Sequence, residues 1–271
     1  MSQEELLWNI GLPALVCGTI LVAVFRPLRN SGGAGSSWAG ANALAAGFVT
    51  AYLVTHNWQL ALPPRHAWEW LVFLAAGAAI AVAYGAGTGG WTTWGLAAGL
   101  SAYLLVGPRV DQFWAWRGLT AGMMVASMAA LSRLQGRANS AVFAVTLSLL
   151  AAACWIILRE SRNEVLAQMA GALSACLAVA AILAWWRPSV SLGAGGVLVA
   201  GMLLPGLMMS AYFQGGKVPD WCLVLAACAP AAYWLAELQA TQRYVSQRPL
   251  LMRVGAILAA AVVAVAGALF M

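Results

Sequence analysis

Residues 139–158 read NSAVFAVTLSLLAAACWIIL, and this stretch decides the fold class. It holds no charged side chain, and its length matches the about 20 apolar residues that an α-helix needs to cross a bilayer. Its apolar residues do not alternate with polar ones, as the strands of a membrane β-barrel require. The stretch therefore predicts a membrane-spanning helix, which satisfies its backbone hydrogen bonds within the segment.

Nine further apolar stretches lie on either side of this one, separated by polar gaps. The fourth, fifth and ninth in chain order are short, so the sequence accommodates eight to ten spans. No hydrophilic stretch approaches the roughly 50 residues that a soluble domain needs. We therefore predict an all-α polytopic transmembrane helix bundle of about ten spans with short loops and no soluble domain, a single integral membrane domain over residues 1–271. The ten stretches are Leu6–Phe25, Trp38–Thr55, Ala67–Tyr84, Trp91–Gly107, Trp116–Leu131, Asn139–Leu158, Val165–Trp186, Ser191–Phe213, Asp220–Ala236 and Val254–Phe270.

The composition supports this prediction independently. Of the 271 residues 63% are apolar and 8% are charged, and the mean hydropathy is +0.82. A soluble domain is about 45–50% apolar and about 25% charged, so a chain this poor in charge could not cover a water-facing surface. The composition excludes a soluble enzyme, a disordered protein and a nucleic-acid-binding protein, and it indicates the lipid bilayer as a partner.

The basic residues indicate an orientation. The chain has 14 Lys and Arg against 8 Asp and Glu, a net charge of +6, and the basic residues fall mostly in the gaps or at the edges of the stretches. The gaps after odd-numbered stretches hold eight of them, and the other side holds six. Because cytoplasmic loops carry the excess of Lys and Arg, we expect a plasma-membrane protein with both termini on the non-cytoplasmic side.

Small residues four apart predict close helix packing. Gly95 and Gly99 form one GxxxG motif, and Gly118 and Gly122 form another. Such faces let helix backbones approach closely where lipid offers no hydrophobic driving force. We expect these faces to be buried inside the bundle, with homodimerisation through one of them as the alternative. A stripe of alanines on the last stretch is expected to behave in the same way: Ala256, Ala260, Ala264 and Ala268.

Two prolines mark candidate hinges. Pro205 and Pro230 lie near the middle of their stretches, and Ser210 follows the first at a short distance. A proline removes a backbone donor and can kink a helix, and interrupted helices at the midplane line the sites of many transporters. In a carrier we expect a water-accessible cavity at this depth. The hydroxyls expected to face it are those of Thr146, Ser148 and Ser174.

Few residues offer catalytic or metal-binding chemistry. His66 and Glu69 are three positions apart, on one face of a helix that begins before them, and His56 lies across the preceding connection. Catalytic zinc usually has three protein ligands, which this group supplies only if the chain folds back. We therefore interpret the histidines as head-group residues, keep Glu69 and His66 as candidates for polar groups in the bundle, and expect no metal and no cofactor. Residues 85–90 match GxGxxG, but an apolar span precedes them where the dinucleotide motif needs a strand.

Two functions from different classes fit these observations. The first is a small-molecule carrier or permease, whose layout is similar to that of the ten-helix drug/metabolite transporters in architecture alone, with no shared motif. The alternative is a non-catalytic membrane anchor or scaffold subunit of a larger complex, which the small-residue faces favour. An enzyme is not expected, because the spans contain no GxSxG, no HExxH and no acidic pair.

Overall fold

A computed structural model describes residues 7–25, 34–59, 62–86, 91–106, 113–215, 217–237 and 249–270. Within these residues the chain is 89% helical, has no strands and forms ten α-helices. The all-helical fold class is therefore confirmed, and each of the ten apolar stretches coincides with one helix. The helices are α2 (Leu12–Phe25), α3 (Ala34–Thr55), α4 (Trp70–Ala81), α5 (Trp91–Leu105), α6 (Phe113–Arg137), α7 (Ser140–Glu160), α8 (Glu164–Trp186), α9 (Gly193–Gln214), α10 (Asp220–Cys228) and α12 (Pro249–Phe270).

Short π- and 3-10-helical segments prolong three of these helices. The π-helical segment η1 (Leu7–Gly11) leads into α2, and the 3-10 segment η3 (Ala67–Glu69) leads into α4. The π-helical segment η4 (Val82–Ala86) continues α4, and the 3-10 segment η5 (Ala229–Glu237) continues α10. These extensions account for the difference in length between the predicted stretches and the regular α-helices.

Six helical segments of the described chain are long and apolar enough to cross a membrane. A seventh apolar segment, Leu7–Ala23, is shorter. The helix α5 has only 15 residues, and α6 carries Arg117, Arg133 and Arg137. The predicted number of about ten spans is therefore not confirmed. The six segments that meet the requirements of length and composition are Trp38–Thr55, Ala67–Tyr84, Ser140–Glu160, Glu164–Trp186, Gly193–Gln214 and Leu250–Phe270.

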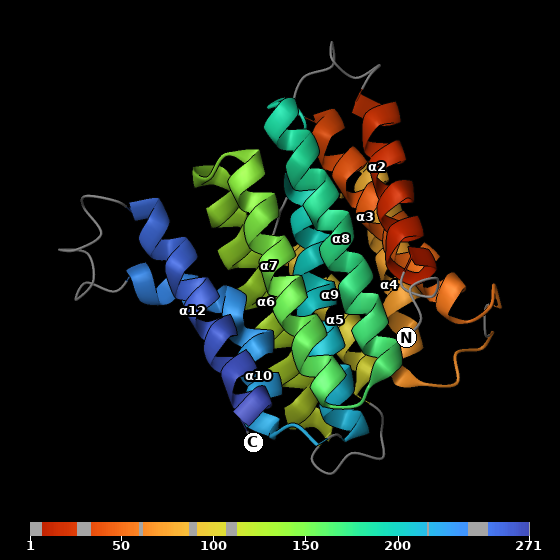
Figure 1. Cartoon of the computed structure of the whole chain (residues 1–271), viewed down its shortest axis with the longest axis vertical. Helices are drawn as coiled ribbons and strands as arrows, with labels where there is room; N and C mark the ends of the chain where they lie inside the picture. The colour runs from red at the N-terminus through yellow and green to blue at the C-terminus, as the bar shows by residue number, and fades with distance from the viewer. Residues whose placement is uncertain are drawn as a thin grey trace.

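The helix α9 forms the centre of the bundle. It contacts α3, α4, α5, α6, α7, α8 and α10. In the most apolar 18-residue stretch of each helix, 89% of the residues of α9 are buried, compared with 17% of those of α12. In Figure 1 α12 lies at one edge of the bundle and α2 lies at the opposite edge. Glycines make this central position possible: a Cβ at Gly201 would lie 2.5 Å from Met128 Cγ, and one at Gly206 would lie 2.6 Å from Leu71 Cδ2.

The glycine pairs expected inside the bundle lie on its outside. A Cβ at Gly95, Gly99, Gly118 or Gly122 would meet nothing within 4 Å, and all four residues are exposed. The prediction that these faces pack within the chain is therefore wrong. The reason is that α5 and α6 turn their larger side chains, including the fully buried Met128, toward the glycines of α9, which provide the close approach instead.

The alanine stripe of α12 is inside the bundle in part. Ala264 and Ala268 are buried, whereas Ala256 and Ala260 are half-buried. The helix packs on α7, α10 and η5. Its remaining faces, with Val262 and Val263, are exposed.

The two ends of the bundle differ in charge. We call them the His66 end, where α3 ends and α4 begins, and the Arg137 end, where α6 ends and α12 begins. Among described side chains the Arg137 end carries four arginines and no acidic group, whereas the His66 end carries both signs. By sequence, the connections and helix edges at the Arg137 end hold eight basic residues and one acidic residue, against six and seven at the His66 end.

Candidate functional site

The two candidate hinge prolines have different effects on their helices. Pro205 is buried within α9, which continues as an α-helix beyond it. Pro230 lies at the second position of η5, where the α-helix α10 gives way to 3-10 geometry. A proline inside a helix removes one i→i−4 hydrogen bond, so the change of helix type at Pro230 follows from its sequence.

Three of the candidate hydroxyls are used in helix hydrogen bonds. Thr146 Oγ1 donates to the carbonyl oxygen of Val142 in its own helix, over 2.8 Å. Ser148 Oγ donates to the carbonyl oxygen of Ser174, and Ser174 Oγ donates to that of Ser148, each over 3.0 Å. Ser148 and Ser174 thus tie α7 to α8, and their place in a solute pathway stays a prediction.

A polar pocket of about 400 Å³ opens at the His66 end. Three parts of the chain form it: the α3–α4 connection, the α7–α8 turn with the start of α8, and the last residue of α9. Its lining includes a cation, a carboxylate and two amide side chains, together with apolar and aromatic side chains. The lining residues are His66, Trp68, Arg162, Asn163, Glu164, Val165, Leu166 and Gln214.

Trp68, which lines this pocket, is at the centre of an aromatic cluster. The Trp68 indole is buried, and the His66 ring lies nearly parallel to it with centroids 6.2 Å apart. The His56 ring lies 5.4 Å from Trp68 and stacks on Tyr52 at 4.3 Å. His56 Nδ1 is 3.0 Å from the carbonyl oxygen of Tyr52. Both histidines of the chain therefore contact one indole.

Glu69 is buried beside the pocket, although it lies at a helix end. Its side chain is 4% exposed, and its Oε2 accepts a hydrogen bond from the backbone N–H of Arg65 over 2.6 Å. A carboxylate needs a partner to be buried, and the N–H of Arg65 provides one. In the described part of the chain no three His, Cys, Asp or Glu side chains are placed to hold a metal ion.

The turn between α7 and α8 holds Arg162 at the pocket in a strained conformation. Arg162 has φ of 63°, and the N–H of Asn163 donates to the carbonyl oxygen of Leu158 over 3.1 Å. This is the Schellman arrangement, whose left-handed residue is usually glycine. For residues other than glycine this conformation costs roughly 1–2 kcal/mol. Strained residues are typical of functional sites.

The helix α9, whose last residue Gln214 lines the pocket, packs on α6. The Trp116 and Tyr212 ring centroids lie 4.8 Å apart near the His66 end, and Met128 contacts Gly201 deeper in the bundle. The two helices are therefore antiparallel. Six of the ten methionines lie on them, and all six are buried: Met123, Met124, Met128, Met202, Met208 and Met209.

Buried hydroxyls lie on both α6 and α9. Ser210 lies one turn inward from the pocket residue Gln214 on the same face of α9, and Thr120 lies at about the same level on α6. The hydroxyl oxygens of Ser210, Thr120 and Ser127 are buried and have no hydrogen-bond partner among the described residues. Further in, Ser101 Oγ donates to the Ala97 carbonyl oxygen and contacts Met202 Sδ at 3.7 Å.

The sequence indicated Ser210, His66 and Glu69 as candidates, but not Arg162, Gln214, Thr120 or Ser127. Thr120 and Ser127 are seven residues apart and so share one face of a helix, which is a signal that the sequence contains. Nothing in the sequence near Arg162 or Gln214 indicates that both residues line one pocket, because their common position depends on how α8 and α9 pack.

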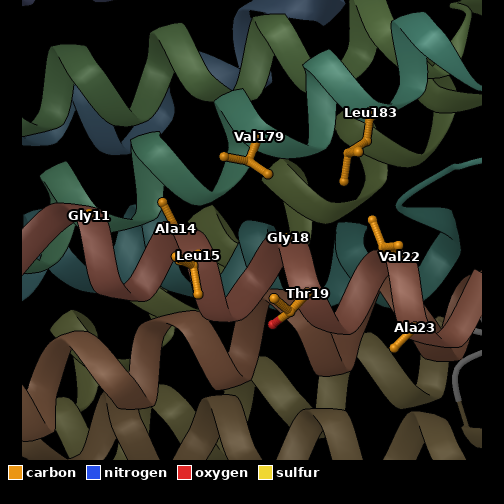
Figure 2. A pocket seen from close by; sticks show the side chains of 9 residues that line it. All are labelled: Gly11, Ala14, Leu15, Gly18, Thr19, Val22, Ala23, Val179 and Leu183. Atoms are coloured by element: carbon orange, nitrogen blue, oxygen red, sulfur yellow. The ribbon is translucent and has the colours of Figure 1, made fainter.

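A second, larger hollow is apolar. It has a volume of about 720 Å³ and runs along α2 beside α8. Figure 2 shows its lining, in which the one side-chain oxygen belongs to Thr19, and that hydroxyl donates to the carbonyl oxygen of Val16 over 2.9 Å. With no other polar side chain, this groove offers hydrocarbon contact and no recognition of a polar solute.

No protein-family model, no curated protein and no solved structure matches the chain. The functional conclusion therefore depends on the chemistry of the site. The helix composition is consistent with a membrane protein.

Proposed function

We propose that the chain is a multi-pass integral membrane protein of about ten spans that carries a small, partly apolar solute, without catalysis. The pathway begins at the polar pocket of the His66 end and continues along the seam between α6 and α9. The charge difference between the two ends supports an orientation in which the Arg137 end is cytoplasmic, since cytoplasmic loops are rich in Lys and Arg. The His66 end and both chain ends then lie on the opposite side of the plasma membrane.

The observation that carries this proposal is the set of three buried hydroxyls without partners on α6 and α9. A buried polar group without a hydrogen bond costs about 1–3 kcal/mol, and apolar residues of the same size would avoid that cost. In another arrangement of the helices, the hydroxyls of Thr120, Ser127 and Ser210 would form hydrogen bonds with water or a solute. Pro205 and Gly206 in the same part of α9 support such a rearrangement.

The lining of the pathway supports a solute with both an apolar part and hydrogen-bonding groups. Trp68 and His66 provide flat rings for stacking, and Arg162, Glu164 and Gln214 provide charges and an amide at the rim. Methionine side chains deeper in the seam are flexible and polarisable, so they adapt to apolar solutes of different shape. This combination favours an amphipathic molecule over an inorganic ion.

Labelling of single cysteines tests the pathway. Ser210→Cys and Thr120→Cys are introduced into a background in which the five native cysteines are replaced by alanine, and vesicles are treated with a water-soluble maleimide. We expect both positions to react, and to react faster from the His66 side. Ala151→Cys, at a fully buried position of α7, is the control and should stay protected. Complete protection of Ser210→Cys and Thr120→Cys in folded protein contradicts the proposal.

A specific observation also favours the scaffold function. The glycines Gly95, Gly99, Gly118 and Gly122 are exposed on neighbouring helices, and they are flanked by exposed leucines such as Leu96. Such small-residue faces allow close approach of another helix in a membrane. We propose as the second candidate that this face binds a membrane-protein partner or a second copy.

Purification in mild detergent separates the two candidates. The scaffold function predicts a stable complex or dimer that Gly99→Leu and Gly122→Leu dissociate, whereas Gly77→Leu on the exposed side of α4 leaves it intact. A wild-type protein that is monomeric by light scattering, with no co-purifying chain, contradicts the scaffold candidate and leaves the carrier as the function.

A further inference from the structure

Three arginines gather around two adjacent aromatic residues at the Arg137 end. Arg133 and Arg137 lie in the last turns of α6, Arg253 lies in the first turns of α12, and Tyr233 and Trp234 lie in η5. We call Arg133, Arg137 and Arg253 the arginine cluster. Its members come from two helices that are far apart in the sequence, so the fold itself assembles them.

The aromatic rings fix the positions of the guanidinium groups. Arg137 Nη1 donates to the Tyr233 hydroxyl over 2.7 Å, and Arg253 Cζ lies 5.7 Å from the centroid of the same ring. Arg133 Cζ lies 4.2 Å from the Trp234 ring, and the two aromatic rings are 5.9 Å apart in an edge-on arrangement. The three cations are thus held near one another by a rigid aromatic pair.

The local sequence does not contain enough negative charge to balance these cations. Glu237 is the one acidic residue in the sequence after Asp220, and Asp220 begins α10 at the opposite end of the bundle. Even with Glu237 counted against the arginine cluster, the three arginines exceed the acidic residues by two. The sequence of the connection from η5 to α12 adds Arg243 and Arg248. Like charges held close together repel, so this end of the bundle favours an anion.

The chemistry of the cluster points to a phosphate group. The planar guanidinium presents its N–H donors as a fork that matches phosphate oxygens. Tyr and Trp at the ends of spans lie at the level of the lipid head groups, and basic sites between helices on the cytoplasmic side bind anionic head groups. We propose that the arginine cluster binds the phosphate of an anionic phospholipid. This inference rests on the proposed membrane-spanning arrangement but not on the carrier function.

Thermal unfolding of the purified protein in neutral detergent tests the site. The probes are phosphatidylglycerol, phosphatidylcholine and sodium phosphate, each added to the same preparation. For the wild type we expect the unfolding temperature to rise with phosphatidylglycerol and to stay unchanged with phosphatidylcholine. The triple variant Arg133→Gln/Arg137→Gln/Arg253→Gln should need at least tenfold more phosphatidylglycerol for the same rise. Arg187→Gln replaces an exposed arginine directly after α8 at the same end. It is the matched control and should behave as the wild type.

The remaining outcomes are decisive in either direction. If sodium phosphate raises the unfolding temperature of the wild type but not of the triple variant, the cluster binds free phosphate. If only phosphatidylglycerol raises it, the cluster binds the phosphate of the lipid head group. Equal shifts by the two lipids, or an undiminished lipid effect in the triple variant, overturn the proposal.

If the triple variant does not fold, Arg253→Gln alone is compared with Arg253→Lys by native mass spectrometry of bound lipid. Equal lipid occupancy in those two variants overturns the proposal, and a loss confined to glutamine supports it. The membrane-spanning arrangement is tested separately: if the protein is recovered in water without detergent, that arrangement is wrong.

Discussion

Ser148 and Ser174 donate hydrogen bonds to each other's main-chain carbonyl oxygen, each over 3.0 Å. This reciprocal pair joins α7 to α8, the two helices with the most extensive mutual contact in the bundle. Hydrogen bonds between helices in a membrane are worth on average about 0.6 kcal/mol each.

Replacing both serines by alanine should therefore destabilise the protein by about 1 kcal/mol. The measurement is the free energy of unfolding in mixed micelles with increasing dodecyl sulfate. Thr146→Val is the matched control, because the Thr146 hydroxyl bonds only within its own helix, and its effect should be smaller. An unchanged free energy in the double variant would mean that packing alone holds α7 on α8.

Gly201 should tolerate no side chain. A Cβ there would lie 2.5 Å from Met128 Cγ and 3.2 Å from Met128 Cα, so the backbones of α6 and α9 must separate to admit it. We expect Gly201→Ala to destabilise the protein by about 1–3 kcal/mol, measured by the same unfolding experiment.

Gly99→Ala is the control for this substitution. A Cβ at Gly99 meets nothing within 4 Å, and alanine is favoured over glycine inside a helix by up to about 1 kcal/mol. It should leave the stability unchanged or raise it. Equal losses in the two variants would show that the contact between Gly201 and Met128 is not tight.

The comparison of these two glycines also shows what the sequence predicts and what it does not. Hydropathy located each α-helix of the described residues, because each apolar stretch must satisfy its backbone hydrogen bonds internally. The GxxxG spacing predicted a close-packing face at Gly95 and Gly99, which is wrong, because the close approach is at Gly201 and Gly206. Spacing gives the face of a helix, but which face turns inward depends on the neighbouring helices, and the chain has 28 glycines from which to choose.

The candidate site was predictable to a similar degree. Ser210 and His66 were identified because a polar residue in or beside an apolar stretch is conspicuous. Their connection through Gln214 and Trp68 was not predictable, since it requires the α3–α4 connection to fold against the end of α9. The burial of Glu69 depends on the same fold, because the backbone N–H of Arg65 reaches it only in the observed turn.

Replacing Arg162 by glycine should raise the stability of the protein. Its φ of 63° lies in the left-handed region, where glycine has no steric cost. We expect Arg162→Gly to stabilise the fold by about 1 kcal/mol while it removes the cation from the rim of the pocket.

Arg159→Gly, in the last turn of α7, provides the comparison. At that helical position glycine should destabilise by about 0.5–1 kcal/mol, so the two substitutions differ in sign. A loss of stability in Arg162→Gly would mean that the arginine side chain forms contacts worth more than its backbone strain.

The buried hydroxyls of α6 and α9 give the last prediction, in which stability and function should change in opposite directions. Ser210 and Ser127 have buried oxygens without partners among the described residues, so Ser210→Ala and Ser127→Ala remove a desolvation cost of about 1–3 kcal/mol each. We expect both variants to unfold at higher dodecyl sulfate than the wild type, whereas Ser174→Ala, which breaks a bonded pair, unfolds at lower dodecyl sulfate. If the hydroxyls serve a solute pathway, Ser210→Ala should also slow labelling of a neighbouring Thr120→Cys, because the polar lining that admits water is interrupted. Destabilisation by Ser210→Ala would show instead that its hydroxyl is hydrogen-bonded in the resting protein, and the carrier proposal would lose the observation on which it rests.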